Sequence, residues 1–268
     1  MKLSAVVLTK NEEKSIERCI KSLLFCDEII IIDDYSEDNT LEKIQNLKSQ
    51  IPNKFKILIF KRKLNKDFAG QRNFGLSKTS NEWVLFVDAD EEVSDDLQKE
   101  IRRNFQFSIL NFQAYYIKRR DYFWGKEIRH GELRQIRLNG LIRLIRKDFG
   151  RWLGNVHEVF HTAKNVGRLK GFLNHYPHST LKEFIKDINF YSTLRAEELY
   201  NQGKSVNVIE IMFVPSLKFI YNYFINFGFL DGPAGFTYAF LMSFHSFLVR
   251  AKLYMLKSSM PKKTSSLL

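Results

Sequence analysis

The segment WVLFVDADEE (residues 83–92) indicates the fold class of this 268-residue chain. Its apolar run, 83–87, has the length and composition of a buried strand, and the run ends at Asp88-Ala89-Asp90. Two carboxylates on either side of one residue in a turn can converge on a divalent cation such as Mg²⁺ or Mn²⁺. The alternative is a solvated loop with helix-capping acids, because further acids follow at Glu91, Glu92, Asp95 and Asp96.

Two earlier segments repeat this pattern of an apolar strand that ends in polar residues. Residues 3–9 (LSAVVLT) lead into Lys10-Asn11-Glu12, and residues 28–32 (EIIII) lead into Asp33-Asp34. A further strand is expected at 55–60, and helices are expected between the strands, at 11–25, 40–47 and 68–78. This alternation predicts a doubly wound, mostly parallel α/β sheet, in which ligands bind at the carboxyl ends of the strands.

The second half of the chain is less regular until its end. We expect a helix from Ser94 to about Phe105, a strand at 113–119 and a helix at 180–202. Residues 206–256 then hold 9 Phe and 4 Tyr in 51 positions. The uncharged run 233–249 is shorter than the roughly 20 residues of a spanning helix, and Pro215 and Lys218 interrupt the apolar run before it. Two amphipathic helices in the plane of one leaflet fit better; the alternative is a helical subdomain packed on the protein.

The net charge of +12 is distributed in blocks. Residues 1–100 carry a net charge of −3, whereas residues 118–151 carry +7 and residues 250–268 hold five basic residues and no acid. The central block, with Arg119, Arg120, Arg143 and Arg146, suits a diphosphate or an acidic acceptor, or is a solvated basic strand. The basic end suits an anionic membrane surface. The acidic first hundred residues oppose the rival hypothesis of a nucleic-acid-binding protein.

The two cysteines and the first residues of the sequence indicate in which cellular compartment the protein is expected. Cys19 and Cys26 form no disulfide framework and no metal-binding spacing, which favours a reducing compartment. The apolar stretch at the start is too short for a signal peptide and lacks a cleavage site.

Taken together, the motifs carry a family resemblance. VVLTKNEE (6–13), IIIIDDYSEDNT (29–40), GQRNFGL (70–76) and VLFVDADEE (84–92) resemble, in order and spacing, the motifs of family 2 glycosyltransferases of the GT-A fold. RRDYFWGKEIRHGE (119–132), IRLIRK (142–147) and NVHEVF (155–160) resemble the branch of lipopolysaccharide-core glucosyltransferases. The resemblance implies an inverting hexosyltransferase that uses a nucleotide-sugar, with a UDP-sugar as the expected donor.

The resemblance also implies roles for particular residues. The nucleobase and ribose pocket would be lined by Thr9, Asn11, Glu12 and Asp34, with Asp34 on the uracil N–H. Arg72 and Asn73 would lie near the sugar-nucleotide, Asp88 would reach ribose or sugar hydroxyls, and Asp90, with Asp88 beside it, would hold Mg²⁺ or Mn²⁺. Arg143 would bind the diphosphate.

An inverting enzyme needs a carboxylate base for the acceptor hydroxyl. We assign this role to Glu158, with Asp148 and Glu132 as alternatives; the other reading of Glu158 is a salt-bridged residue beside His157. His157, His161, His175 and His178 are expected to be mainly structural, although one could bind metal or phosphate, and for His157 the two readings are balanced. No Q-x-x-R-W run occurs, which favours the transfer of one sugar per cycle.

The expected organisation follows from these motifs. Residues 1–204 form the catalytic domain, with a nucleotide-sugar half at 1–110 and an acceptor half at 111–204, and residues 205–268 form apolar helices and a basic tail. The expected partners are a nucleotide-sugar, a lipid-linked envelope glycan and the anionic cytoplasmic face of the inner membrane, without nucleic acid. A non-catalytic scaffold is a third hypothesis, which the intact Asp88 and Asp90 oppose.

Overall fold

The computed structural model describes residues 2–51, 55–107, 110–154, 158–162, 165–178 and 180–258. The chain forms two compact units, one of Met1–Tyr122 and Gln135–Pro177 and one of Phe123–Arg134 and His178–Leu268. This division differs from the expected boundary at residue 204. Helix α6 (Leu181–Asn201) belongs to the second unit, because Phe184 and Ile188 share a hydrophobic cluster with Ala234 and Leu241 of α8.

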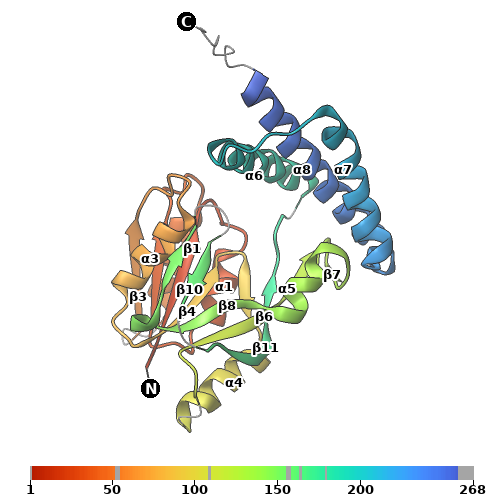
Figure 1. The fold of residues 1–268 in the computed structure, drawn as a ribbon. Helices are drawn as coiled ribbons and strands as arrows, with labels where there is room; N and C mark the ends of the chain where they lie inside the picture. The colour runs from red at the N-terminus through yellow and green to blue at the C-terminus, as the bar shows by residue number, and fades with distance from the viewer. Residues whose placement is uncertain are drawn as a thin grey trace, which may run out of the picture. The chain divides into compact units, whose positions relative to one another are not determined.

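The first unit is built on a mixed sheet with the strand order β3-β2-β1-β4-β8-β6-β11-β5 (Figure 1). The strands are β1 (Leu3–Thr9), β2 (Glu28–Asp33), β3 (Lys56–Lys61), β4 (Trp83–Asp88), β5 (Glu91–Val93), β6 (Ala114–Phe123), β8 (Leu141–Arg146) and β11 (Gly167–His175). The first four in this order are parallel, as predicted. Beyond β4 the sheet is mixed, because β8 runs antiparallel to both β4 and β6.

Helices and shorter elements accompany this sheet. They are α1 (Ile16–Ser22), α2 (Thr40–Gln50), α3 (Phe68–Lys78), α4 (Asp95–Gln106), α5 (Arg134–Asn139), the short helix η2 (Lys147–Phe149) and the antiparallel pair β9 (Arg151–Leu153) and β10 (Val159–His161). The predicted helices at 68–78 and 94–105 agree closely with α3 and α4. The helix expected at 11–25 is shorter, since residues 10–15 form a loop that hydrogen-bonds to the loop after β2.

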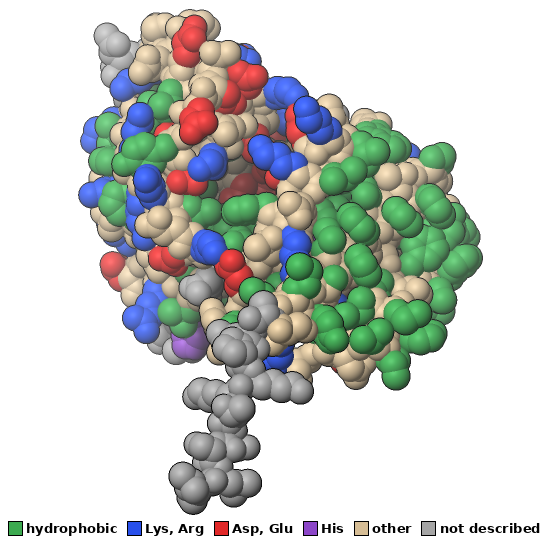
Figure 2. Space-filling view, turned by 90° about the horizontal axis from the view of Figure 1, so that it is seen from above, with side chains coloured by type: hydrophobic (Ala, Val, Ile, Leu, Met, Phe, Trp, Pro, Cys, Tyr) green, Lys and Arg blue, Asp and Glu red, His purple; other side chains and the backbone are tan. Residues whose placement is uncertain are grey.

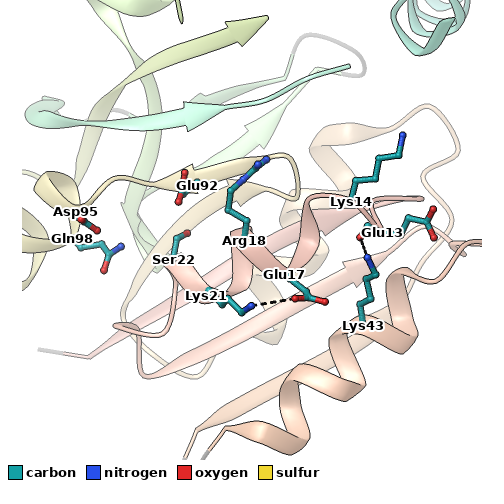
Figure 3. Close-up of a pocket in the computed structure, with 10 residues that line it drawn as sticks. All are labelled: Glu13, Lys14, Glu17, Arg18, Lys21, Ser22, Lys43, Glu92, Asp95 and Gln98. Carbon is teal, nitrogen blue, oxygen red and sulfur yellow. Dashed lines mark hydrogen bonds and ion pairs between the residues drawn. The ribbon is translucent and has the colours of Figure 1, made fainter. Parts of the chain in front are cut away.

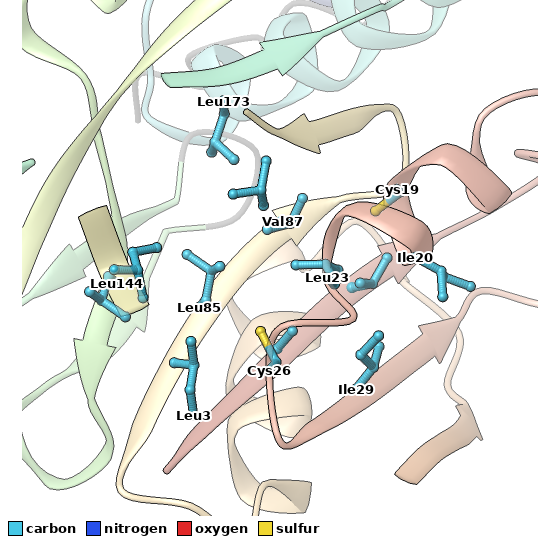
Figure 4. Packing of buried hydrophobic residues seen from close by; sticks show 14 of the residues in the cluster. Leu3, Cys19, Ile20, Leu23, Cys26, Ile29, Leu85, Val87, Leu144 and Leu173 are labelled. Atoms are coloured by element: carbon cyan, nitrogen blue, oxygen red, sulfur yellow. The ribbon is translucent and has the colours of Figure 1, made fainter. Parts of the chain in front are cut away.

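Both faces of the parallel strands are covered, which explains their continuous apolar runs. Successive side chains of β1 point to opposite faces, so Ala5 and Val7 join one hydrophobic cluster and Val6 joins another. Figure 4 shows the first cluster, in which Cys19 and Cys26 lie among leucine and isoleucine side chains. Both cysteines are free and buried, and burial raises the pKa of each thiol.

The strand register brings the polar strand ends together. Thr9 is paired with Asp33 across β1 and β2, and Leu8 is paired with Asp88 across β1 and β4. The amide of Asp34 donates to the carbonyl of Thr9, and that of Ala89 donates to the carbonyl of Leu8. The motifs predicted to bind the ligand therefore meet at the carboxyl edge of the parallel strands.

The second unit is helical. Besides α6 it contains the short strand β7 (Lys126–Ile128) and the helices η1 (Gly131–Leu133), α7 (Val208–Ile220), η3 (Tyr221–Ile225), η4 (Gly228–Asp231) and α8 (Gly232–Ser258). Among the described residues, one helical stretch, Val208–Ile225, is long and apolar enough to cross a membrane by length and composition, with a mean hydropathy of 1.4 and 11% of it buried.

Candidate active site

Asp88 and Asp90 lie in the turn between β4 and β5, at the carboxyl edge of the sheet. The side chain of Glu91 closes this turn, because its Oε2 accepts the backbone N–H of Asp88 at 3.0 Å. Glu91 is fully buried, although its position in the sequence suggested a helix-capping or solvated acid. The turn is thus held by a carboxylate inside the protein.

Two arginines hold the carboxylate of Asp88. Nη2 of Arg143 lies 2.6 Å from Oδ2, and Nη2 of Arg72 lies 3.0 Å from Oδ1. Burial favours the neutral acid, but the positive charges of Arg143 and Arg72 outweigh it and hold the pKa of Asp88 well below its usual range. Asp88 is therefore ionised and fixed in orientation.

Arg72 also binds the predicted catalytic base. Its Nε donates to Oε1 of Glu158 at 2.7 Å, and the Arg72 side chain is only 5% exposed. The guanidinium lies over the ring of Trp152, 5.0 Å from its centroid. Arg72 on α3 and Glu158 are 86 residues apart, yet one guanidinium joins Glu158 to Asp88.

Arg143 was expected to bind a diphosphate, but its guanidinium is buried against carboxylates. Besides Asp88, it contacts Oε1 of Glu91 at 3.3 Å, and Nη1 of Arg119 lies 3.6 Å from the same oxygen. Burial raises the pKa of Glu91 above its usual value, and the nearby charge of Asp88 adds to this effect, while Arg143 and Arg119 oppose it. The visible role of Arg143 is to fix Asp88 and Glu91.

A histidine binds the second aspartate of the turn. Nε2 of His175 lies 3.1 Å from Oδ2 of Asp90, and Nδ1 lies 2.6 Å from Oδ1 of Asp121. Burial and Arg119 lower the pKa of His175, but Asp90 and Asp121 outweigh them and raise it to about 9. We had expected His175 to be mainly structural; strand pairing, which places it beside Glu91 and Asp121, brings it into the site.

The residues predicted for the nucleobase pocket surround the ends of β1 and β2. The side chain of Asn11 accepts the N–H of Glu37, and Asp34 accepts the N–H of Leu64 at 2.9 Å and the ammonium of Lys10 at 2.9 Å. The backbone N–H of Glu12 donates to Thr40. The hydroxyl of Thr9 is buried and has no hydrogen-bond partner within the described part of the chain.

Other predicted residues have structural partners. The amide of Asn73 exchanges two hydrogen bonds with the backbone of Trp152, at 2.9 and 3.0 Å, and so attaches α3 to β9. Asp148 lies beyond Arg146, which pairs with Trp83 at the opposite end of β4 from Asp88, so it does not belong to this site. Glu132 lies in the second unit and binds Lys218 and Asn222. His157 lies outside the described residues.

A separate open pocket of about 530 Å³ lies along α1 (Figure 3). Its lining alternates in charge, with Glu13, Glu17, Glu92 and Asp95 against Lys14, Arg18, Lys21 and Lys43. Two of these cations already have partners, since Lys21 pairs with Glu17 and Lys43 donates to the carbonyl of Glu13. The balanced charges give this pocket no preference for an anion, and neither Asp88 nor Asp90 lines it.

Comparison with known proteins identifies the family. Residues 4–164 match the family model for glycosyl transferase family 2. The chain belongs to this family. The site at the end of β4 therefore lies in a glycosyltransferase domain, as the sequence motifs predicted.

Similar proteins agree with this assignment. The lipopolysaccharide core biosynthesis glycosyltransferase LpsC of Rhizobium meliloti is 31% identical over 94% of this chain and 92% of its own length. An uncharacterized glycosyltransferase of Rickettsia typhi is 32% identical over 94% of this chain and 86% of its own length. The crystal structure of TarS residues 1–349 of Staphylococcus aureus with UDP-GlcNAc matches with a TM-score of 0.50 and 16% identity, over 98% of this chain and 93% of that one. The predicted GT-A fold is confirmed.

Proposed function

We propose that this protein is an inverting hexosyltransferase that moves one sugar from a UDP-sugar to a lipid-linked envelope glycan, such as lipopolysaccharide core. The observation that carries the proposal is the network at the end of β4, in which Asp88 and Glu158 share Arg72 and Asp90 faces His175. The similarity to LpsC supports the acceptor class, and the UDP-GlcNAc bound by TarS supports the donor class.

Asp90 and His175 are the residues that fit a divalent metal. Among the described residues no group of three or more His, Cys, Asp or Glu side chains could hold an ion. Mg²⁺ needs no such group, because one or two protein ligands with substrate phosphates suffice. Asp90 would hold the ion through its carboxylate, and His175, whose Nε2 lies 3.1 Å from Oδ2 of Asp90, would be a further ligand in its neutral form. Asp121 would orient His175 as carboxylates orient metal-binding histidines.

Bound Mg²⁺ or Mn²⁺ would supply positive charge to the leaving diphosphate. Asp88 already has two guanidinium partners, which makes it less suited to the metal than Asp90 and better suited to accept hydrogen bonds from ribose or sugar hydroxyls.

Glu158 is the proposed base. The proton of the acceptor hydroxyl moves to its carboxylate, the hydroxyl oxygen bonds to the anomeric carbon, and the bond from that carbon to the diphosphate oxygen breaks with its electron pair on the diphosphate. Arg72 positions Glu158 by holding Oε1. Thr9, Asn11, Glu12 and Asp34 are proposed to hold the nucleoside, and their position around the carboxyl ends of β1 and β2 supports this assignment.

We place the reaction at the cytoplasmic face of the inner membrane, with the protein bound peripherally. A lipid-linked acceptor requires the site to reach a membrane surface. The exposed apolar side chains of α7 and α8 support this location.

The decisive experiment compares two aspartate variants in a UDP-release assay with a panel of UDP-sugars, Mg²⁺ or Mn²⁺ and a lipid-linked glycan fraction. We expect Asp90→Asn to lower transfer by at least about a hundredfold, because it removes a charged metal ligand. Asp96→Asn is the matched control, since Asp96 is exposed on the first turn of α4 and should retain activity. Full transfer by the Asp90 variant would refute the metal assignment.

The same assay tests the base. Glu158→Gln keeps the size of the side chain and a hydrogen-bond acceptor for Arg72 but cannot take a proton. We expect kcat to fall by about a hundredfold or more with an unchanged donor KM. A variant with normal kcat and only a raised acceptor KM would show that Glu158 binds the acceptor without acting as the base.

A further inference from the structure

Helix α7 and the following η3 carry apolar side chains on their exposed side. The exposed residues include Ile209, Met212, Phe213, Leu217, Ile220, Tyr221, Phe224 and Ile225. The opposite side, which faces the protein, holds Pro215, Lys218 and Asn222. A surface helix in water has the reverse arrangement, with its polar residues outside.

The polar groups on the inner side form hydrogen bonds and ion pairs with residues 123–134. Glu132 accepts from Nζ of Lys218 at 3.1 Å and from Nδ2 of Asn222 at 3.2 Å. The side chain of Asp231, which is buried in the turn before α8, accepts the N–H groups of Arg129 and His130 and lies 3.0 Å from Nδ1 of His130. Between Glu210 and Arg250, Lys218 and Asp231 are the charged residues, and both have such partners.

Helix α8 buries a row of small residues against η4 and α7 and exposes phenylalanines. Gly235, Ala239 and Ser243 are spaced by four residues and buried, a pattern of closely packed membrane helices. A Cβ atom on Gly235 would lie 2.1 Å from the carbonyl oxygen of Gly228, so this approach requires glycine. The hydroxyl of Ser243 donates to the carbonyl of Pro215. The exposed residues of α8 include Phe236, Phe240, Phe244 and Phe247.

We infer that this apolar face, formed by the exposed residues of α7, η3 and α8, is embedded in the hydrocarbon of one leaflet of an anionic bilayer. Hydrophobic side chains cover a broad, nearly continuous area in Figure 2. Exposed apolar patches that are rimmed by polar residues mark sites of contact with a membrane or with another protein. Contact with lipid explains why the exposed side of these helices is apolar and why the polar groups on their inner side are paired, since unpaired charges are costly in hydrocarbon.

The helices lie in the membrane plane, because the unit also has a charged side. Helix α6, which packs along α8, bears Lys182, Lys186, Arg195 and Glu197. A transmembrane arrangement would take these charges into the bilayer with α8. Arg250 and Lys257 near the end of α8, with no acid between them, favour anionic headgroups at the edge of the apolar face. The ammonium of Lys252, which lies between them, donates instead to Asn189, Ser192 and Thr193 of α6.

This inference deepens the proposed membrane location and is tested without donor, acceptor or metal, so its failure is separate from a failure of sugar transfer. The 268-residue protein is sedimented with two kinds of vesicle, one of pure phosphatidylcholine and one that also contains about 30 mol% phosphatidylglycerol. We expect binding that is stronger with phosphatidylglycerol and that high salt weakens but does not abolish, because the apolar insertion remains.

Three variants locate the contact. Leu217 and Phe240 are 61% and 55% exposed, so glutamate there leaves the core intact. Leu217→Glu and Phe240→Glu should each weaken vesicle binding by about tenfold or more. Phe190→Glu is the matched control, since Phe190 is 47% exposed on α6 and should bind as the unchanged protein does. Thermal unfolding of each variant checks that it is folded.

Several outcomes would overturn the inference. The first is that the unchanged protein does not bind vesicles. The second is that the Phe190 variant loses as much vesicle binding as the other two variants. The third is that the Leu217 and Phe240 variants bind vesicles as well as the unchanged protein does. A stable dimer that forms without vesicles, does not bind them, and dissociates in the Phe240 variant would show that a second copy covers this face.

Discussion

Replacing Arg143 by Met should destabilise the first unit strongly at neutral pH. The guanidinium is buried and neutralises two carboxylates, those of Asp88 and Glu91. Methionine replaces the unbranched aliphatic part of the side chain but leaves both acids without this partner. Removing one member of a buried ion pair costs about 3–5 kcal/mol when the remaining charge is uncompensated. Because Arg72 still holds Asp88 and Arg119 still lies 3.6 Å from Glu91, we expect a loss at the lower end, about 3 kcal/mol.

Arg146 provides a matched control on the same strand. It pairs with Glu82, and these side chains are 36% and 48% exposed. Exposed ion pairs contribute about 0–1 kcal/mol, so Arg146→Met should lower the free energy of unfolding by no more than that. The two substitutions are chemically identical and three residues apart, and they differ in burial and in the charges that they leave behind.

The stability deficit of the Arg143 variant should depend on pH because of Glu91. Burial already raises the pKa of this carboxyl, and loss of Arg143 raises it further. A carboxyl with a pKa above its unfolded value lowers stability while it is ionised, and this cost disappears as the pH falls and the folded protein takes up the proton. The deficit of the Arg143 variant should therefore be larger at pH 7.5 than at pH 5.5.

Urea unfolding at both pH values measures these deficits. In a Trp124→Phe background the fluorescence reports Trp83 and Trp152, which both lie in the first unit. Equal unfolding free energies for the Arg143 and Arg146 variants would refute the claim that the buried network stabilises this unit. If the loss of unfolding free energy in the Arg143 variant were as large at pH 5.5 as at pH 7.5, ionised Glu91 would not be its cause.

Two further predictions concern the metal and Asn73. Asp90 and Asp121 raise the pKa of His175 to about 9. If His175 binds the metal as proposed, its proton must leave, so calorimetry should find that Mn²⁺ affinity rises with pH by up to about tenfold per unit below pH 9, and His175→Gln should flatten this dependence. Asn73→Ala removes two hydrogen bonds to the backbone of Trp152 and should lower the unfolding free energy by about 1–3 kcal/mol in the same urea assay, whereas a change confined to the donor KM would contradict this structural role.

Much of the nucleotide-sugar half could be predicted from the sequence. Strand β1 agrees with the predicted range 3–9, and α3 agrees with 68–78. These elements have strong local signals, since buried parallel strands are continuous apolar runs and helices repeat with a period of 3.6 residues. The mixed half was less predictable, because β8 reads as a basic segment whose Arg143 is buried by carboxylates distant in the chain.

The partners within the site were less accessible to sequence reasoning. The motifs identified Asp88, Asp90 and Arg72 as site residues, but no spacing indicated that His175 would meet Asp90. That contact depends on the pairing of β11 with β5 and β6. The sequence likewise assigned no buried role to Glu91, which entered only in the alternative of a solvated loop with helix-capping acids. Its burial depends on Arg119 and Arg143, which come from other strands.

The sequence by itself determined the family, the parallel strands and the carboxylate turn at Asp88-Ala89-Asp90, because these are encoded in contiguous residues. Only the tertiary structure decided which charges pair. It buried Arg143 between Asp88 and Glu91 and turned Lys218 inward to Glu132, which leaves the exposed side of α7 apolar. The physical reason is that hydrophobic periodicity is local, whereas the environment of a charge depends on strands and helices far away in the chain.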